Sequence, residues 1–211
     1  MSELFILTER PSIYLASKSP RRAELLRQIA VQFEELPLRE APGRRRDIIE
    51  VPRKEESPVE YVKRIARTKA SVGWHRMGRR NLAPKPVLGA DTEVILDNAI
   101  VGKPADATDA IAILKRLSGR THEVVTAVAI RWRSQILLSL SSSRVTFGSI
   151  GDDEVQHYVT AGESLDKAGG YAVQGRAAAF VSHIDGSYSG VVGLPLYETA
   201  ELLKRVGFHV L

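Results

Sequence analysis

The chain has 211 residues, of which 44% are hydrophobic and 26% charged, and this composition is ordinary for a soluble globular protein with one large domain or two small lobes. It contains no cysteine, which excludes disulfides and zinc–thiolate sites and fits a reducing, cytoplasmic compartment. No apolar run approaches the roughly 18 residues of a membrane span, and the first ten residues lack the apolar core of a signal peptide. We therefore expect no membrane partner.

The charge balance points to an anionic partner without identifying it. The net charge is +5 and the pI about 9.6, which suits nucleic acid or a small phosphate compound. On charge alone, a solvated basic surface is the more ordinary explanation. Aromatic residues make up only 6% of the chain, which weakens the case for a base-stacking surface.

Strand-like and helix-like patterns alternate along the chain, which predicts an α/β fold. In chain order, we expect a strand at 12–17, a helix at 20–29, a polar loop at 39–56, a helix at 57–72, a strand at 87–96 with a return strand at 99–103, a helix at 106–118, strands at 122–130 and 136–147, a helix at 152–160, strands at 177–184 and 188–193, and a helix at 195–207.

Several boundaries carry their own signals. Ser57 and Glu60, with a proline between them, form a capping box at a helix start. Asp97-Asn98 predicts a hairpin between residues 87–96 and 99–103. Asp185-Gly186 predicts a second hairpin between residues 177–184 and 188–193.

The helix that follows the first strand begins with an unusual pair of cations. Ser19 and Pro20 suit the cap and the first helical position, but Arg21 and Arg22 come next. The N-terminal end of a helix is partly positive, so two bases are unfavourable there unless an anion is bound. Together with Ser17, which can donate a hydrogen bond, these arginines suit a phosphate, although a tolerant surface helix explains the sequence about equally well.

Asp91 lies within the otherwise apolar stretch VLGADTEVIL. A carboxylate in a central strand is unfavourable unless it is paired, hydrogen-bonded or bound to a metal. A magnesium site or a general base explains it, and an edge strand with one wet face is the alternative. Gly89 beside it indicates a close approach of another backbone segment, which favours a functional role.

Two lysines are further candidates for phosphate contacts. Lys69 lies on the apolar side of its predicted helix, and Lys103 precedes a proline at a strand end. Either ammonium group could bind phosphate, but a lysine such as Lys69 more commonly extends its head to solvent.

Other nucleotide and catalytic motifs are missing. Gly170 and Gly175 have the spacing of the first P-loop glycines, but Arg176 and Ala177 replace the required Lys and Ser or Thr. There is no GxGxxG or GxSxG motif, and the five histidines have no metal-ligand spacing.

Taken together, the motifs resemble those of the Maf family, septum-formation-inhibitor proteins that act as nucleoside triphosphate pyrophosphatases. The resemblance runs from Ser12 to Phe208, and its landmarks are LASKSPRRAELL, EYVKRIARTKA, LGADTEVIL, GKP, LSGRTHEVVTAVAI, DKAGGYAVQG and GSYSGVVGLPLYET. It implies a single α/β domain over residues 1–211, with an elongated mixed sheet, flanking helices and a deep cleft between two lobes. It also implies a homodimer and a divalent cation, Mg²⁺ or alternatively Mn²⁺.

The residues and the resemblance together single out nine positions. Asp91 matches the catalytic aspartate and, with Glu50, would hold the metal, although Ile49 stands where the family has a second acid. The substrate-binding positions are Ser17, Arg21, Arg22, Lys69, Thr92, Lys103 and Gln174. Of these, Arg21, Thr92 and Gln174 are associated with the choice of base.

Intact SPRR, ADT and GYAVQG segments are similar to the subgroup that hydrolyses dTTP and UTP. A pyrophosphatase for 7-methyl-GTP or another modified nucleotide is the alternative within the family. A basic nucleic-acid-binding module that uses Arg44–Arg46 and Arg79–Arg80 is the alternative from another class, although we expect no nucleic-acid partner. The family's name also suggests a role in cell division.

Overall fold

The protein is built around a mixed β-sheet of seven strands. The structure, a computed structural model, describes residues 11–39 and 47–210. The strands follow the order β2-β1-β3-β5-β6-β7, and β4 pairs with β3. β1 runs parallel to β2 and β3, whereas the other pairs are antiparallel. The strands are β1 (Ser12–Leu15), β2 (Gln32–Glu35), β3 (Val87–Leu96), β4 (Ala99–Ile100), β5 (Thr121–Trp132), β6 (Gln135–Phe147) and β7 (Val181–Asp185).

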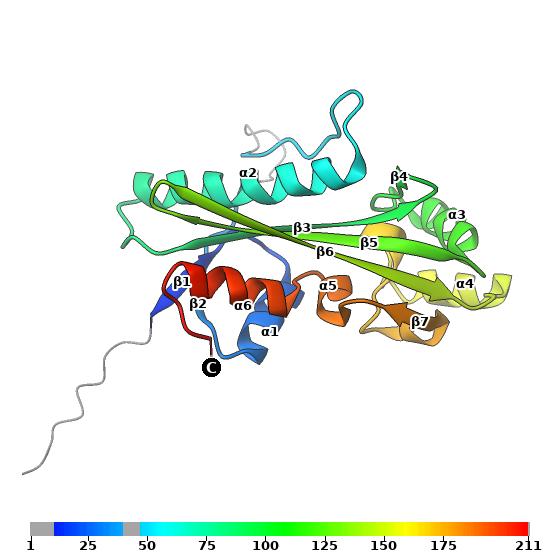
Figure 1. The fold of residues 1–211 in the computed structure, drawn as a ribbon. Coiled ribbons are helices and arrows are strands. Elements are labelled where there is room, and N and C mark those ends of the chain that lie inside the picture. The colour runs from blue at the N-terminus through cyan, green and yellow to red at the C-terminus, as the bar shows by residue number, and fades with distance from the viewer. Residues whose placement is uncertain (1–10, 40–46, 211) are drawn as a thin grey trace, which may run out of the picture.

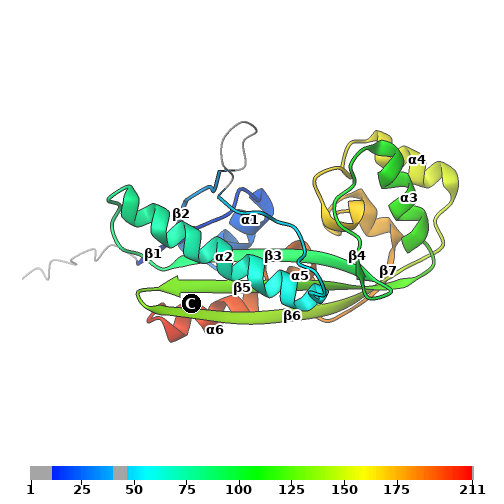
Figure 2. The same ribbon diagram turned by 90° about the horizontal axis from the view of Figure 1, so that it is seen from above.

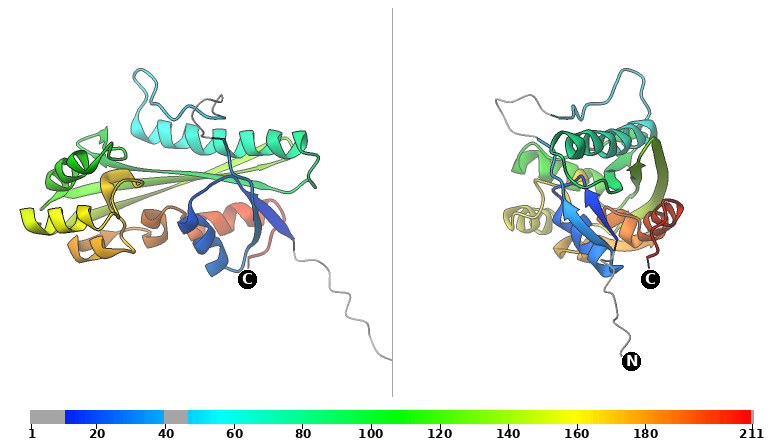
Figure 3. Two further views of the ribbon diagram at one scale, coloured as in Figure 1. Left: turned by 180° about the vertical axis from the view of Figure 1, so that it is seen from behind. Right: turned by 90° about the vertical axis from the view of Figure 1, so that its left-hand side faces the viewer.

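Helices cover both faces of this sheet, which confirms the predicted α/β class. They are α1 (Pro20–Gln28), α2 (Pro58–Arg79), α3 (Ala107–Leu117), α4 (Asp152–Thr160), α5 (Tyr188–Val192) and α6 (Leu196–Arg205), with 3₁₀ turns at Ala168–Gly170 and Arg176–Phe180. Figure 1 shows α2 on one face and α1, α5 and α6 on the other, and the views in Figure 3 agree. Seen from above, α3 and α4 form a group at one end of the sheet, apart from α1, β1 and β2 (Figure 2).

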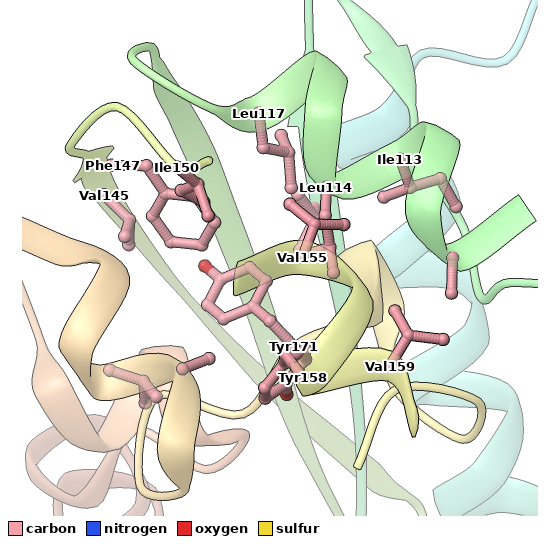
Figure 4. Close-up of a cluster of buried hydrophobic side chains, with 14 of the residues drawn as sticks. Ile113, Leu114, Leu117, Val145, Phe147, Ile150, Val155, Tyr158, Val159 and Tyr171 are labelled. Carbon is pink, nitrogen blue, oxygen red and sulfur yellow. The ribbon is translucent and has the colours of Figure 1, made fainter. Parts of the chain in front are cut away.

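The two ends of the molecule have separate apolar clusters. One cluster joins β1, α1 and α6 around Leu15, Leu26 and Leu203. The other joins α3, α4 and the end of β6, and Figure 4 shows Leu114, Phe147 and other members of it close together. Both clusters include residues of β3 and β5, so the long strands connect the two lobes.

The predicted boundary signals act locally as expected at most positions. The Ser57 hydroxyl accepts a hydrogen bond from the Glu60 N–H at 3.3 Å. Asp97 and Asn98 have φ angles of 53° and 61°, and their turn leads directly into β4, as predicted.

Residues 188–193 were expected to form a strand, and this prediction is wrong. Residues 188–192 form α5, because the Ser187 side chain caps a helix by accepting a hydrogen bond from the Gly190 N–H at 3.0 Å. Gly186 has a φ of 128°, and a Cβ there would lie 2.6 Å from Ser143 Oγ. The glycine therefore allows the chain to pass close to β6 before it turns into the helix. The preceding expected strand begins only at Val181.

Two other elements differ from the sequence prediction. β2 was not predicted, because it is an edge strand whose residues are mostly exposed and show little apolar pattern. α2 continues past the expected end at Val72 to Arg79. Gly73 lies inside this helix because a Cβ there would meet Val87 Cγ1 at 2.7 Å, so this glycine marks close packing and not a helix end.

Within residues 11–39 and 47–210, no helix is long and apolar enough to cross a membrane. The expectation about the first ten residues lies outside the described part of the chain, and so does the basic run Arg44–Arg46.

Candidate active site

A cleft of about 620 Å³ opens along one side of β3. On that side, β1 pairs only with Val87 and Leu88, and β4 only with Ile95 and Leu96. The stretch of β3 between these pairs therefore has no strand beside it, and side chains from both of its faces reach the cleft. All nine residues singled out from the sequence line it: Ser17, Arg21, Arg22, Glu50, Lys69, Asp91, Thr92, Lys103 and Gln174.

Lys69 connects two of the predicted acids. Its Nζ lies 2.8 Å from Asp91 Oδ1 and 2.8 Å from Glu50 Oε1. The side chain is largely buried, so the alternative in which it extends into solvent is wrong. The ammonium group compensates the charge of two carboxylates that would otherwise repel each other across the cleft.

Gly89 makes this contact possible, as its position in the sequence suggested. A Cβ on Gly89 would lie 2.5 Å from the Ala70 nitrogen and 2.8 Å from the Ala66 oxygen. The backbone of α2 therefore rests directly on β3, and this brings Lys69 within reach of Asp91. β3 lies between β1 and β5 in the sheet, but at Asp91 it pairs with β5 alone. The strand therefore has a free edge at this position, as the alternative supposed, yet the Asp91 side chain is buried.

Asp91 is buried, and its second oxygen, Oδ2, has no hydrogen-bond partner among the described residues. Burial raises the pKa of Asp91, and Lys69 and Arg22 offset this only in part. A buried, unpaired carboxylate oxygen is unfavourable unless a proton, a metal ion or water meets it. Asp91 Oδ2 is therefore suited to accept a proton or to bind a cation.

Glu50 is the more exposed of the two acids. Burial raises its pKa, but Lys69, Lys103 and Arg22 outweigh that effect, so its pKa is lowered overall. Glu50 is therefore ionised at neutral pH, next to an aspartate that is harder to ionise. The pKa values of the two acids are thus shifted in opposite directions, which is common for paired acid–base or metal-binding groups.

The turn before α1 supplies the cationic side of the cleft. Ser19 is the N-cap, but its side chain makes no capping hydrogen bond, so the first N–H groups of α1 remain available to an anion. Arg22 is tied in place: Nε donates to the Gly193 oxygen at 2.8 Å, Nη1 to Ser17 Oγ at 3.3 Å and Nη2 to Thr92 Oγ1 at 3.2 Å. Burial lowers the pKa of Arg22, and Asp91 opposes this.

Three predicted residues have no hydrogen bond or ion pair with any described residue: Arg21, Lys103 and Gln174. Lys103 and Gln174 are exposed, and Arg21 is partly exposed. Arg21 lies in the first turn of α1. The Gly169 N–H donates to the Gly102 oxygen at 2.7 Å and links the segment around Lys103 to the one before Gln174. The side chains of Arg21, Lys103 and Gln174 are therefore free to contact a ligand, while the backbone that carries them is held in place.

The cleft also contains charged residues for which the sequence suggested no role. Glu93 lies near Asp91, and burial together with that neighbour raises its pKa to about 8. Arg39, Asp166 and Lys167 line the cleft as well, and the last two form an ion pair with each other. Side chains alternate between the two faces of β3, so the sequence already placed Glu93 on the same face as Asp91. That pattern could have identified Glu93 as a residue of the site. The other three lie in loops and gave no such signal.

A second hollow, of about 580 Å³, lies over the start of β5 and contains no predicted site residue. Its charged side chains pair largely with one another or with a neighbour, as Arg144 does with Asp185 and Arg120 with Asp97. It therefore offers few free groups to a charged ligand.

Comparison with known proteins gives a consistent result. A family model described as Maf-like protein matches residues 12–206. A dTTP/UTP pyrophosphatase of Nitrosospira multiformis is 54% identical over 198 residues, covering 94% of this chain and 96% of that protein. One of Aromatoleum aromaticum is 53% identical, covering 93% and 96%. The solved structure of the Staphylococcus aureus Ham1 protein superposes with a TM-score of 0.39 at 13% identity, over 67% of this chain and 72% of that one, which is too distant a likeness to bear on function.

Proposed function

Since this chain belongs to the Maf family, we propose that it is a nucleoside triphosphate pyrophosphatase that hydrolyses dTTP and UTP to the monophosphate and pyrophosphate. Relatives more than 50% identical over nearly the whole chain are named dTTP/UTP pyrophosphatases. The observation that carries the proposal is the single cleft in which the Asp91–Lys69–Glu50 group and the basic turn at Arg21 and Arg22 occur together.

The cationic residues bind the triphosphate. Arg21 and Lys103 form no hydrogen bond or ion pair with any described residue, so their charges are available to the phosphates. The N–H groups at the start of α1 add neutral donors. Arg22 and Ser17 bind the phosphates while Arg22 also fixes the turn. Holding a tetra-anion in one orientation lowers the barrier mainly through positioning and electrostatic stabilisation.

The residues present fit a divalent cation at Asp91 and Glu50. Asp91 Oδ2 is an orphaned buried oxygen, and both acids contact the same ammonium group. Within the described residues there is no group of three or more His, Cys, Asp or Glu side chains that could hold a metal ion. The two carboxylates suit Mg²⁺ or Mn²⁺, since Mg²⁺ often takes one or two carboxylates and completes its shell with phosphate oxygens and water. When bound, such an ion neutralises phosphate charge and acidifies water.

Asp91 orients the attacking water and accepts its proton. The water oxygen forms a bond to the α-phosphorus, the bond from that phosphorus to the bridging oxygen breaks, and pyrophosphate leaves with the bond's electron pair. Burial raises the pKa of Asp91, which strengthens it as a base. Lys69 keeps the carboxylate oriented through Oδ1 and leaves Oδ2 free.

The choice of base depends on Arg21, Thr92 and Gln174. Gln174 is exposed at the cleft and has a free amide that can pair with the O4 and N3–H edge of a pyrimidine. Thr92 Oγ1 already accepts a hydrogen bond from Arg22 Nη2 at 3.2 Å and shares one with Thr126 Oγ1 at 2.9 Å. Thr92 therefore acts on substrate choice by orienting Arg22, and not through a free hydroxyl.

One assay tests this function. Purified protein is incubated with Mg²⁺ or Mn²⁺ and a panel of nucleoside triphosphates that includes dTTP, UTP, the purine nucleotides and 7-methyl-GTP, and pyrophosphate and orthophosphate are measured separately. Pyrophosphate release with dTTP and UTP supports the proposal. Preferential turnover of 7-methyl-GTP favours the alternative within the family, and orthophosphate release refutes cleavage at the α-phosphorus.

The remaining expectations have their own tests. A homodimer, a cytoplasmic location and a role in cell division are what the resemblance and composition favour, and light scattering measures the first directly. The nucleic-acid alternative predicts tight, steeply salt-dependent binding of a labelled duplex without nucleotide turnover. Of the residues that it would use, Arg79 and Arg80 are exposed at the end of α2.

A further inference from the structure

Residues 47–56, called the strap below, cross beside the cleft without forming a helix or a strand. The strap runs over α2 toward the start of that helix (Figure 1). Ile48, Ile49, Glu50 and Val51 line the cleft. Ile49 is 74% exposed and Val51 60%, so apolar burial at these positions contributes little to holding the strap in place.

Ile48 is partly buried and packs against two apolar clusters, and ion pairs hold the strap on either side of it. Three of its carboxylates pair with three cations of α2, and the pairs are Asp47 with Arg76 at 2.8 Å, Glu50 with Lys69 at 2.8 Å and Glu56 with Arg64 at 2.6 Å. The strap therefore runs antiparallel to α2: as the residue number increases along the strap, the residue number of the partner in the helix decreases. From Arg64 to Arg76 the helix rises about 18 Å, and nine strap residues span about 30 Å when extended, so the strap reaches both ends without strain.

The outer two pairs are better supported than the central one. The Asp47 carboxylate is 6% exposed and also accepts from the backbone N–H, Nε and Nη2 of Arg39 at 2.9–3.1 Å. The Glu56 carboxylate accepts from Arg64 Nε and Nη2 at 2.6 and 2.7 Å and from the Arg53 N–H at 2.9 Å. Bidentate, charge-assisted contacts of this kind are strong and directional.

The central pair is the exchangeable one. The Glu50 side chain is 41% exposed, and Lys69 divides its ammonium group between Glu50 and Asp91. Any phosphate or cation that enters the cleft competes for one of these groups. Glu50 keeps its place during such an exchange only if the strap is anchored elsewhere.

We propose that Asp47 and Glu56 are positioning residues that anchor the strap to α2 and so hold Glu50 at the catalytic cleft. They touch neither substrate nor metal in this role. Their effect on turnover rests on the proposed function, but their effect on the order of the strap does not.

Asp47→Asn and Glu56→Gln test the anchors with little change in shape. We expect each to lower kcat/KM about 10- to 100-fold, as the loss of an outer partner of a metal ligand commonly does, with most of the loss in kcat. The matched control is Glu60→Gln, which removes the 2.9 Å pair with Lys63 on the same helix but outside the strap. This control should keep the kinetics of the parent protein.

Two readouts separate positioning from general stability. In a Glu50→Gln background, Asp47→Asn should have little further effect on kcat, because the two changes act through one group. Hydrogen exchange without nucleotide or metal should show faster exchange at the hydrogen-bonded strap amides of Asp47, Arg53 and Glu56 in Asp47→Asn and Glu56→Gln, but not in Glu60→Gln. Parental kinetics in both anchor variants, or unchanged exchange in the strap, overturns the proposal. A parent protein that hydrolyses no nucleoside triphosphate refutes the function, and the exchange result still decides the anchors.

Discussion

Gly89→Ala is a small change that should disturb both the fold and the reaction. The new Cβ would lie 2.5 Å from the Ala70 nitrogen, 2.8 Å from the Ala66 oxygen and 2.9 Å from Lys69 Cβ. Ordinary contacts between such atoms are about 3.5 Å or longer. α2 must therefore move away from β3 by about 1 Å at this point, and two of the three opposing atoms belong to the helix backbone, which cannot rotate aside.

The cost of this movement follows from known magnitudes. Overpacking destabilises by about 1–3 kcal/mol, while replacing glycine with alanine restores about 0.4–1 kcal/mol through the unfolded chain. We therefore expect a net loss of about 1–2 kcal/mol, which for a chain of this size lowers Tm by about 2–8 °C. A shift of about 1 Å also stretches the contact between Lys69 and Asp91, and errors of that size reduce turnover by as much as about 100-fold.

Gly78→Ala is the matched control, since it is the same substitution in the same helix with nothing within 4 Å of the new Cβ. It should raise stability by about 0.5–1 kcal/mol and leave turnover unchanged. Urea unfolding and pyrophosphate release are measured for both variants. Parental kcat and stability in Gly89→Ala would refute the conclusion that the close approach of α2 to β3 positions Lys69.

Three further outcomes are expected. Arg22→Ala should weaken binding of a triphosphate analogue more than binding of the monophosphate in calorimetric titrations, and equal losses would argue against a phosphate role. Gln174→Ala should change the ranking of bases in the nucleotide panel, whereas an unchanged ranking would assign base recognition to another group. Burial lowers the pKa of His122 from 6.5 to about 4, so the unfolded chain gains a proton first and stability should fall by up to about 1.4 kcal/mol per pH unit as the pH drops from 6.5 to 4. His122→Gln should flatten this part of the profile in urea unfolding, and an identical slope in both proteins would contradict it.

Local signals in the sequence were sufficient for most elements but not for their arrangement. The Ser57 cap, the Asp97-Asn98 turn and the two long strands β5 and β6 depend on neighbouring residues, and each was predicted. Residues 188–193 carry the β-branched pattern of a strand, yet they form a helix because Ser187 caps it and Gly190 receives a hydrogen bond from Thr126 on β5 at 2.8 Å. These two residues are 64 positions apart in the sequence, so nothing near residues 188–193 indicates that they will meet.

The site residues, like the secondary-structure elements, were predictable where the signal was local and not where it depended on packing. Asp91 was recognisable as a carboxylate in an apolar strand, and the Maf resemblance supplied the other positions. The division of Lys69 between two acids and the tie from Arg22 to Gly193, 171 residues away, depend on the packing of α1, α2 and α5 around β3. The anchoring of the strap by Asp47 and Glu56 was hidden for the same reason, since their partners lie on a helix that follows in the chain.

The central claim is that Asp91, with its free oxygen in the cleft, carries out the hydrolysis of a bound nucleoside triphosphate. The most direct test is single-turnover hydrolysis of dTTP by Asp91→Asn, with binding of a non-hydrolysable analogue measured on the same sample. We expect turnover to fall by about 10²–10⁴-fold while the folded protein still binds the analogue. Turnover close to that of the parent protein would contradict the account.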